Sequence, residues 1–244
     1  DFKMDYLVVR KKEATNRIHL SEIGILIVES TAVSLTAVLL CELVKRKIKV
    51  IFCDEQHNPH SELLPCYGSH DTSAKVKKQI EWNQEIKNMV WTEIVCEKIR
   101  QQAAHLKTRG LESQAKLLEK YIKEVEFSDE TNREGHAAKV YFNALFGMDF
   151  TRSLDNSTNA ALNYGYGIML SCFNREITAN GYITQIGLFH DNMFNQFNLA
   201  SDLMEPFRVL VDKKVKEMNP IKFEHEEKME LVYLLSSTVI IDGK

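Results

Sequence analysis

The stretch that decides the fold is Thr131-Asn-Arg-Glu-Gly-His-Ala-Ala-Lys-Val-Tyr-Phe-Asn-Ala-Leu-Phe146. Its residues recur at the spacing of a helix, so Glu134, Tyr141 and Leu145 share one mostly apolar face. A carboxylate on the buried side of an amphipathic helix is costly unless it meets a cation or a hydrogen-bond donor. The pattern therefore predicts that Glu134 has a partner elsewhere in the chain.

The strongest candidates for that partner lie further along the chain. His190 ends the apolar run Ile186-Gly-Leu-Phe, and Asp202 and Glu205 lie three residues apart, on one face of a predicted helix. Carboxylate and imidazole groups set in apolar sequence are typical of a divalent-cation site. Each group also has an ordinary interpretation: a first-turn carboxylate favoured by the helix dipole, a satisfied core or capping histidine, and a chance pair of acids.

The periodicity changes once along the chain. Residues 1–67 alternate with period two around one helix expected over residues 34–47, and from residue 73 onward nearly everything has helical spacing. We expect helices over 75–108, 111–125, from about 134, over 159–179, over 199–218 despite Pro206, and over 226–236. This predicts an α+β protein with a β-rich N-terminal domain over 1–67, a linker over 68–73 and an α-helical domain over 74–244.

Composition excludes several classes of protein. The chain has 244 residues, 44% of them hydrophobic, and a net charge of −3, which excludes a uniformly basic nucleic-acid-coating protein. Five scattered cysteines without a Cys-x-x-Cys pair are typical of a reducing cytoplasm, and no apolar run is long enough to span a membrane. Charge is locally uneven, because basic residues gather over 75–109: Lys75, Lys77, Lys78, Lys87, Lys98, Arg100, Lys107 and Arg109. Such a stripe is either a phosphate-binding groove or the solvated face of a helix.

Several catalytic motifs are missing from the sequence. It contains no Gly-x-Gly-x-x-Gly, His-Glu-x-x-His, Gly-x-Ser-x-Gly or P-loop. Tyr164-Gly-Tyr-Gly167 lies in a helical pattern, and we interpret its glycines as a place of close helix packing. Nothing indicates a protein nucleophile or an ATP site. The remaining chemistry is metal-assisted, with substrate or water as the nucleophile, as in phosphodiester transfer.

Long motifs in a fixed order carry a family resemblance. They are Leu63-Leu-Pro-Cys-Tyr-Gly-Ser-His-Asp71, Asn132 to Gly147, Asn163-Tyr-Gly-Tyr-Gly167, Gly187-Leu-Phe-His190 and Phe197-Asn-Leu-Ala-Ser-Asp-Leu-Met-Glu-Pro-Phe-Arg208. Together they resemble the CRISPR-associated adaptation integrase, the first-numbered Cas protein, in the form found beside single-effector type II systems. The resemblance implies a β-rich N-terminal domain for dimerisation or scaffolding over 1–67, a catalytic helical C-terminal domain over 74–244 and a homodimer.

The resemblance also implies an activity. It places Mg²⁺ or Mn²⁺ on Glu134, His190 and Glu205, which are then the catalytic residues, with Asp202 at the position of an acid used in some relatives. The 3′-hydroxyl of a captured DNA fragment would attack a phosphodiester at the border of a CRISPR repeat. Two dimers would flank a dimer of the small second adaptation protein, giving a 4:2 complex. Type II relatives also work with the effector nuclease and a ring-shaped protein that binds DNA ends.

DNA contacts and two rival functions complete these expectations. The candidates for phosphate contacts are Arg133, Lys139, Arg208, Lys213 and Lys214. One rival is a metal-dependent endonuclease or resolvase, and the other is a non-catalytic DNA-binding scaffold whose acids and histidine only hold helices together. The chain begins without methionine and ends in Asp242-Gly243-Lys244, a turn sequence without its return strand. We therefore expect residues to be missing at both ends.

Overall fold

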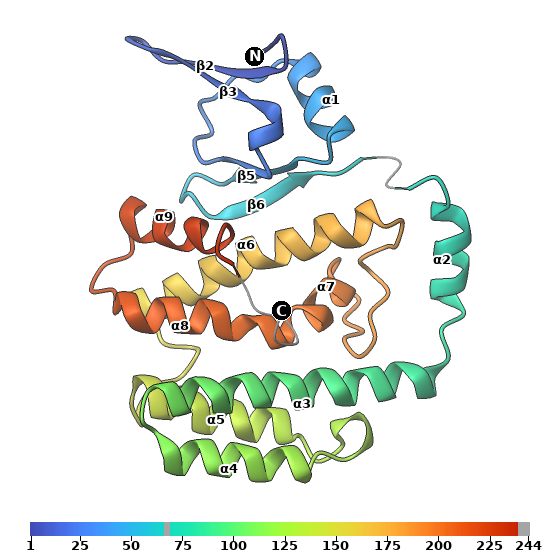
Figure 1. Ribbon diagram of the computed structural model, residues 1–244, viewed down its shortest axis with the longest axis vertical. Helices are drawn as coiled ribbons and strands as arrows, with labels where there is room; N and C mark the ends of the chain where they lie inside the picture. The colour runs from blue at the N-terminus through green and yellow to red at the C-terminus, as the bar shows by residue number, and fades with distance from the viewer. Residues whose placement is uncertain (66–68, 239–244) are drawn as a thin grey trace. The chain divides into compact units, whose positions relative to one another are not determined.

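The computed structural model describes residues 1–65 and 69–238 (Figure 1). The chain divides into two compact units, Asp1–Val76 with Ser171–Ile183, and Lys77–Leu170 with Thr184–Lys244. This division differs from the expected boundary at 68–73, because residues up to 76 and a distant segment, 171–183, belong to the first unit. Residues 66–68, where the expected linker begins, and 239–244, where we expected an interrupted hairpin, lie outside the described residues.

The strands of the first unit form two small sheets. β1 (Phe2–Lys3), β2 (Tyr6–Arg10) and β3 (Thr15–His19) form an antiparallel sheet in that order. After the short 3₁₀ turn η1 (Leu20–Glu22), β4 (Ile25–Val28) pairs in parallel with β5 (Lys49–Cys53), which pairs antiparallel with β6 (Pro59–Leu63). The first unit is thus β-rich, as the period-two pattern predicts.

Helix α1 (Ala37–Lys45) connects the parallel strands β4 and β5. Parallel neighbours need such a crossover, and a helix supplies it. The Thr36 hydroxyl caps the helix by accepting the N–H of Leu39 (3.4 Å), so the helix begins later than the expected residue 34. Leu39 and Leu43 are fully buried and pack in a cluster with Val50 of β5. This cluster is the hydrophobic core of the first unit.

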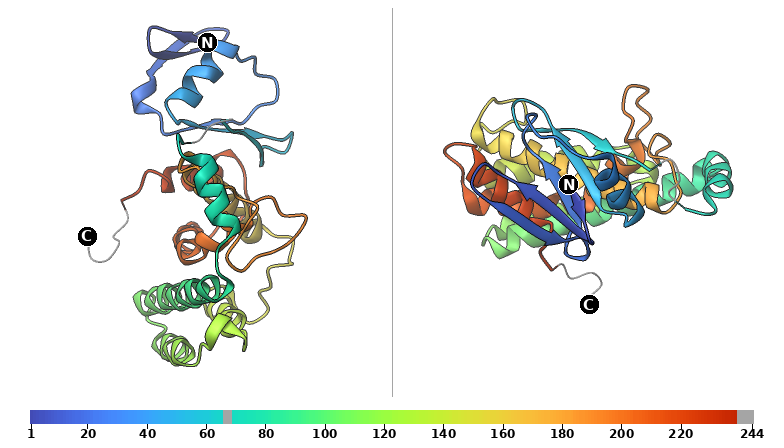
Figure 2. Two further views of the ribbon diagram at one scale, coloured as in Figure 1. Left: turned by 90° about the vertical axis from the view of Figure 1, so that its right-hand side faces the viewer. Right: turned by 90° about the horizontal axis from the view of Figure 1, so that it is seen from above.

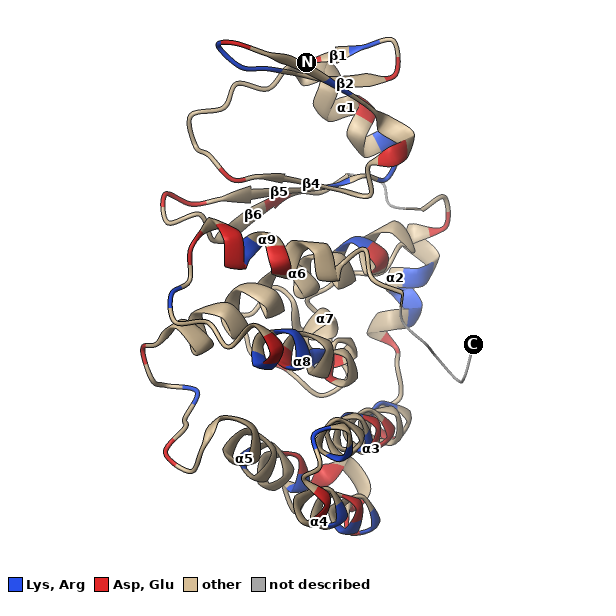
Figure 3. Cartoon of the chain, turned by 60° about the vertical axis from the view of Figure 1, so that its left-hand side comes forward, with Lys and Arg blue, Asp and Glu red and all other residues tan. Residues whose placement is uncertain are grey.

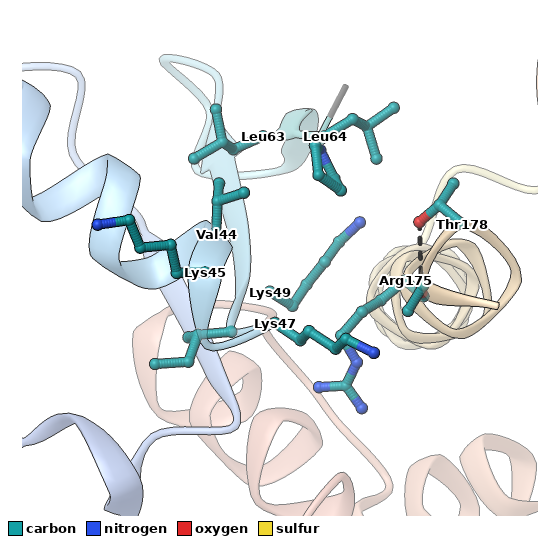
Figure 4. A pocket seen from close by; sticks show the side chains of 11 residues that line it. Val44, Lys45, Lys47, Lys49, Leu63, Leu64, Arg175 and Thr178 are labelled. Carbon is teal, nitrogen blue, oxygen red and sulfur yellow. Dashed lines mark hydrogen bonds between the residues drawn. The ribbon is translucent and has the colours of Figure 1, made fainter. Parts of the chain in front are cut away.

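The first unit contains a cavity of about 270 Å³ (Figure 4). Its lining includes the basic side chains Lys45, Lys47, Lys49 and Arg175. Lys49 forms a buried ion pair with Glu62, and Arg175 donates to the carbonyl oxygen of Gly24 (3.1 Å). Much of the positive charge is therefore compensated inside the unit, and none of the predicted site residues lines the cavity.

The second unit is helical. Its elements are α3 (Gln84–Thr108), α4 (Glu112–Lys123), the 3₁₀ turn η2 (Phe127–Asp129), α5 (Arg133–Phe146), the first part of α6 (Ser157–Ala179), α7 (Asn198–Leu203), the 3₁₀ turn η3 (Glu205–Phe207), α8 (Arg208–Met218) and α9 (His225–Leu234). Helices α3, α4 and α5 lie side by side (Figures 1 and 2). Trp91, Leu118 and Tyr141, one from each helix, are among the fully buried residues of their common core.

Two predicted long helices are interrupted. The pattern over 75–108 forms α2 (Thr72–Ile80) and α3, separated at residues 81–83, because the Asn83 side chain accepts the N–H of Glu85 (2.7 Å) and starts a new helix. The pattern over 199–218 forms α7, η3 and α8, because Pro206 lacks an N–H and lies in the first turn of η3. The predictions of single helices were wrong at these points, whereas the α+β fold class is confirmed.

Charge on α3 and α4 is mixed rather than basic. Figure 3 shows acidic and basic residues intermingled on both helices, and Lys107 of α3 pairs with Glu119 of α4. Arg100 likewise pairs with Glu97 within α3. Most of the basic residues over 75–109 therefore belong to the solvated face of a helix and not to a phosphate-binding groove. Lys98 is the exception considered below. Among the described residues, no helix combines the length and apolar character that crossing a bilayer requires.

Candidate metal centre

Glu134 lies in the first turn of α5, and its position is fixed by side chains that cap the helix. The buried Asp129 carboxylate accepts the N–H groups of Arg133 (2.7 Å) and Glu134 (3.0 Å). Asn132, in the left-handed conformation, accepts the N–H of Gly135 (3.2 Å). Amide groups that a helix leaves without partners at its start are thus satisfied. The first turn is held in place, with the Glu134 side chain half-buried.

His190 is held by Asp202, which is completely buried at the end of α7. One oxygen of Asp202 accepts the N–H groups of Leu188 (2.6 Å) and Phe189 (3.1 Å), and the other contacts the N–H (3.1 Å) and Nδ1 (2.5 Å) of His190. The hydrogen bond to Asp202 raises the pKa of His190 above its ordinary value. Asp202 therefore orients the ring and leaves Nε2 as the nitrogen for another ligand.

Gly187 allows the backbone to approach Asp202 closely. A Cβ atom on Gly187 would lie 2.5 Å from the carbonyl oxygen of His190 and 2.7 Å from Oδ2 of Asp202. Both distances are far below ordinary van der Waals contact, so this position excludes a side chain. The glycine of the Gly-Leu-Phe-His motif is therefore part of the geometry that places His190.

Glu134 and Glu205 meet at the ammonium group of Lys98. The Lys98 side chain comes from α3, and its Nζ contacts Oε1 of Glu134 and lies 2.5 Å from Oε2 of Glu205. Lys98 is 8% exposed and Glu205 5%. The structure thus brings together the two acids that the sequence singles out, and supplies a cation between them that the sequence argument did not identify.

Arg208 occupies the other oxygen of Glu205. Its Nε donates to Oε1 of Glu205 (2.9 Å), and its guanidinium lies over the ring of Tyr166, 4.7 Å from the centroid. Burial opposes ionisation of Glu205, but the charges of Lys98 and Arg208 outweigh it and hold the pKa of Glu205 below its ordinary value. Glu205 is therefore a buried carboxylate that stays ionised.

An aromatic wall closes the histidine side of the site. Trp91 of α3 is 1% exposed, stacks on Phe189 (centroids 4.4 Å apart) and meets the His190 ring edge-on (5.6 Å). Trp91 and Lys98 are seven residues apart on α3 and share one face. One helix therefore positions both the aromatic support of His190 and the cation between the acids.

A metal would find a suitable set of donors here. Within residues 1–65 and 69–238, no group of three His, Cys, Asp or Glu side chains is already arranged around a common metal position. However, Glu134 and Glu205 converge on one cation, and the Asp202 contact keeps His190 oriented with Nε2 available. Oxygen ligands with one imidazole nitrogen suit Mg²⁺ or Mn²⁺. The donor set fits such an ion, and the assignment of Glu134, His190 and Glu205 as its ligands stays a prediction.

The predicted DNA-contact residues are placed differently from one another. Arg208 lies in the site, whereas Arg133 is directed to Glu124 (3.3 Å) and to the ring of Tyr121. Lys139 is exposed on α5. On α8, Lys213 is half-buried, and Lys214 pairs with Glu230 of α9. The structure therefore brings one of the five, Arg208, to the candidate centre.

The sequence argument missed Lys98 by grouping it with the exposed lysines. A signal was available, because Lys98 follows Trp91 and Val95 at helical spacing and so belongs to the apolar stripe of α3. A lysine in such a stripe needs a buried acid as partner. The partners of Lys98 are Glu134 and Glu205, the two acids that the sequence predicts as metal ligands.

Comparisons with known proteins identify the family of this chain. The model of the family described as CRISPR associated protein Cas1 matches residues 1–236. The CRISPR-associated endonuclease Cas1 of Neisseria meningitidis serogroup C (strain 8013) is 36% identical over 209 residues, which cover 86% of this chain and 69% of the relative. The family model and this identity together establish the family.

Solved structures share the fold. A casposase bound to integration product superposes with a TM-score of 0.76 at 18% identity, over 97% of this chain and 78% of the other. A Cas6-RT-Cas1–Cas2 complex gives a TM-score of 0.72 at 20% identity, over 96% of this chain and 30% of that longer chain. Fold, motif order and sequence similarity lead to one conclusion: this chain belongs to the CRISPR-associated Cas1 family.

Proposed function

We propose that this chain is a metal-dependent DNA integrase of CRISPR adaptation, which joins the 3′-hydroxyl ends of captured DNA to phosphodiesters at the borders of a CRISPR repeat. The observation that carries the proposal is the convergence of Glu134 and Glu205 on one cation position, beside a histidine oriented by Asp202. A relative named an endonuclease and a structural neighbour, a casposase bound to integration product, support the same chemistry.

The chain's own groups would orient and neutralise the reacting parts. A bound Mg²⁺ or Mn²⁺ would supply a Lewis acid for phosphate oxygens and for the attacking hydroxyl. Asp202 fixes the His190 ring, Trp91 supports it, and Arg208 keeps Glu205 ionised in a buried place. The 3′-hydroxyl of the captured DNA would attack phosphorus at the repeat border, the bond from that phosphorus to the 3′-oxygen of the repeat strand would break, and this transesterification needs no serine or cysteine nucleophile.

Endonuclease activity is the second candidate. With water in place of the 3′-hydroxyl, the same groups would cleave a phosphodiester instead of transferring it to the end of the captured DNA. The relative from Neisseria meningitidis is named an endonuclease, which favours this candidate over the non-catalytic scaffold. The two activities differ in the nucleophile, so one experiment can separate them.

Partners follow from the proposed function. We expect this chain to form a homodimer in the cytoplasm. Two such homodimers would flank a dimer of the small second adaptation protein, giving a 4:2 complex. The Cas1–Cas2 composition of a structural neighbour supports this partner. For a type II-like form, the effector nuclease and a ring-shaped DNA-end-binding protein are further partners.

A strand-transfer gel tests the proposal. A labelled duplex with free 3′-hydroxyls is incubated with a repeat-bearing plasmid, the small partner protein, and Mn²⁺ or EDTA. Wild type should join label to plasmid only with Mn²⁺, and Glu134→Gln should lower joining more than about 100-fold, because losing a ligand costs at least as much as losing its outer partners. Glu130→Gln, an exposed acid four residues away, should join like wild type.

The rival functions give different gels. Shortened label without joined plasmid would assign the chain to the endonucleases. Equal joining by wild type and Glu134→Gln would contradict the proposed site. Bound but chemically unchanged DNA in every lane would assign the chain to the scaffolds.

A further inference from the structure

Lys98 is the buried cation that fills the space between the two acids. It reaches Glu134 of α5 and Glu205 of η3 from a third element, α3, with 8% of its surface exposed. A lysine is buried to this extent when it is paired, and here it has a carboxylate partner on each of two elements. Its ammonium thus neutralises part of the charge that a divalent ion would otherwise neutralise.

Both oxygens of Glu205 already face a cation. Oε2 contacts Lys98 and Oε1 contacts Arg208. A metal ion bound through Glu205 therefore meets one of these two positive charges at close range, and like charges at such a distance repel each other strongly in a buried place. Each carboxylate oxygen has a second lone pair, so the ion can still bind, but it competes with the nearer cation, and this repulsion is relieved when that cation moves away.

The contacts indicate that Lys98 is the cation that withdraws. It lies between Glu134 and Glu205, where a metal shared by them would be, whereas Arg208 contacts Glu205 alone of the two acids. The guanidinium of Arg208 also rests on the ring of Tyr166, a second contact that holds it in place. Lysine carries a compact charge on a flexible chain, so it can retract without breaking a stacked arrangement.

We propose that Lys98 is a resident cation of this centre, which holds Glu134 and Glu205 together without metal and is displaced from between them when a divalent ion binds. The proposal rests on the metal site of the proposed function. It assigns Lys98 a positioning role that sets the metal affinity. The cost of displacing the ammonium lowers the apparent affinity for the ion.

Metal binding without DNA tests this role. Mn²⁺ is titrated into the full chain, and free Mn²⁺ is followed by its electron paramagnetic resonance signal. Lys98→Met should bind Mn²⁺ at least about tenfold more tightly than wild type, because no ammonium has to leave. Lys107→Met is the matched control: this exposed lysine of the same helix pairs with Glu119, and its loss should leave the affinity unchanged.

The outcomes separate this proposal from the proposed function. If wild type binds Mn²⁺ and Lys98→Met binds it with equal or lower affinity, the role of Lys98 is overturned and the metal site stands. No Mn²⁺ binding by wild type or by either variant would overturn both. Tighter Mn²⁺ binding by Lys98→Met, with Lys107→Met equal to wild type, supports the role of Lys98 and the metal site.

A second variant covers the case in which Lys98→Met does not fold in chelator. Lys98→Arg keeps a cation between the acids, so it should fold in EDTA and should not bind Mn²⁺ more tightly than wild type. Thermal melting gives an independent readout: Mn²⁺ should raise the Tm of Lys98→Met more than that of wild type. An equal rise in both proteins would contradict the proposal.

Discussion

At the scale of single residues, Asp202 shows how one buried carboxylate can shape a loop. Its oxygens serve three consecutive backbone N–H groups and the His190 ring, and its side chain has no solvent contact. The sequence places Asp202 and Glu205 on one face of a helix, but in the structure a 3₁₀ turn begins at Glu205 and the two acids have different partners. Asp202 contacts His190, and Glu205 contacts Lys98 and Arg208.

Replacing Asp202 by asparagine should destabilise this loop. The new side-chain amide would place an NH₂ group opposite backbone donors, leaving a buried donor unsatisfied and removing charge-assisted hydrogen bonds, at a cost of about 2–4 kcal/mol. Urea denaturation of Asp202→Asn measures the loss in unfolding free energy. Asp191→Asn, the exposed neighbour of His190, should change that free energy by less than about 0.5 kcal/mol. Equal effects of the two substitutions would contradict the anchoring role of Asp202.

At the scale of elements, helix α3 contributes more to the site than its sequence indicates. Sequence periodicity predicts its helical state and its apolar face, since these depend on local spacing. It did not predict the break before Gln84 or the identity of the groups that Lys98 meets. The first depends on one capping side chain, that of Asn83, and the second on two elements that lie far away in the chain.

A buried polar junction joins four helices of the second unit. Tyr166 of α6 donates a hydrogen bond to Asp212 of α8, and Tyr141 of α5 contacts both Asp212 and His105 of α3. Sequence patterns carried no signal for this group, because each member looks like an ordinary core or surface residue in its own helix. Gly165 of the Tyr-Gly-Tyr-Gly motif precedes Tyr166, and a Cβ atom on Gly165 would be 2.4 Å from the side chain of Val211. This agrees with the interpretation of that motif as close helix packing.

The junction should make stability depend on pH through Asp212. Burial raises the pKa of Asp212 from 3.8 to about 6. A raised carboxyl pKa stabilises the folded state fully below pH 3.8, and this contribution is lost as the pH rises through 6. Asp212→Asn has no carboxyl to titrate, so the unfolding free energy of the variant minus that of wild type should increase by about 2 kcal/mol between pH 4 and pH 7.

Denaturation in urea at several pH values measures this difference. Taking the difference from wild type also cancels the opposite contribution of His105, whose pKa burial lowers to about 4. Asp149→Asn, an exposed acid, should give a difference that does not vary with pH. A flat curve for Asp212→Asn would show that this carboxyl does not titrate in the folded protein as described.

At the scale of the whole molecule, the family and the α+β class could be predicted from sequence, because long motifs in order and a single change of periodicity specify them. The predicted family is confirmed by the match over residues 1–236. The assignment of residues 171–183 to the first unit could not be predicted. It depends on contacts between segments far apart in the chain, which periodicity does not report.

We expect this chain to form a homodimer through the sheet of β1, β2 and β3. That sheet and its first turn expose apolar side chains, with Met4 80%, Tyr6 39% and Ile18 40% exposed. The strand register pairs Ile18 with Leu7 and Tyr6 with His19, so the exposed Tyr6 and Ile18 side chains lie on opposite faces of the sheet, and a change at Ile18 tests one of these faces as the interaction surface. Light scattering at micromolar concentration should give twice the mass of one chain, and Ile18→Glu should shift the mass toward the monomer. Ile221→Glu, at a site 95% exposed in the second unit, should remain dimeric. A monomeric wild type would contradict this expectation.

The ion pairs of Lys98 bear on how the protein survives when metal is scarce. Small zinc proteins fold only when the ion binds, because the site does not exist in the unfolded chain and metal binding supplies the free energy of folding. Here Lys98 balances the buried acids from within the chain. With the metal site proposed above, the chain would therefore fold without the ion, and the folded protein would already hold both acids in place when the ion arrives.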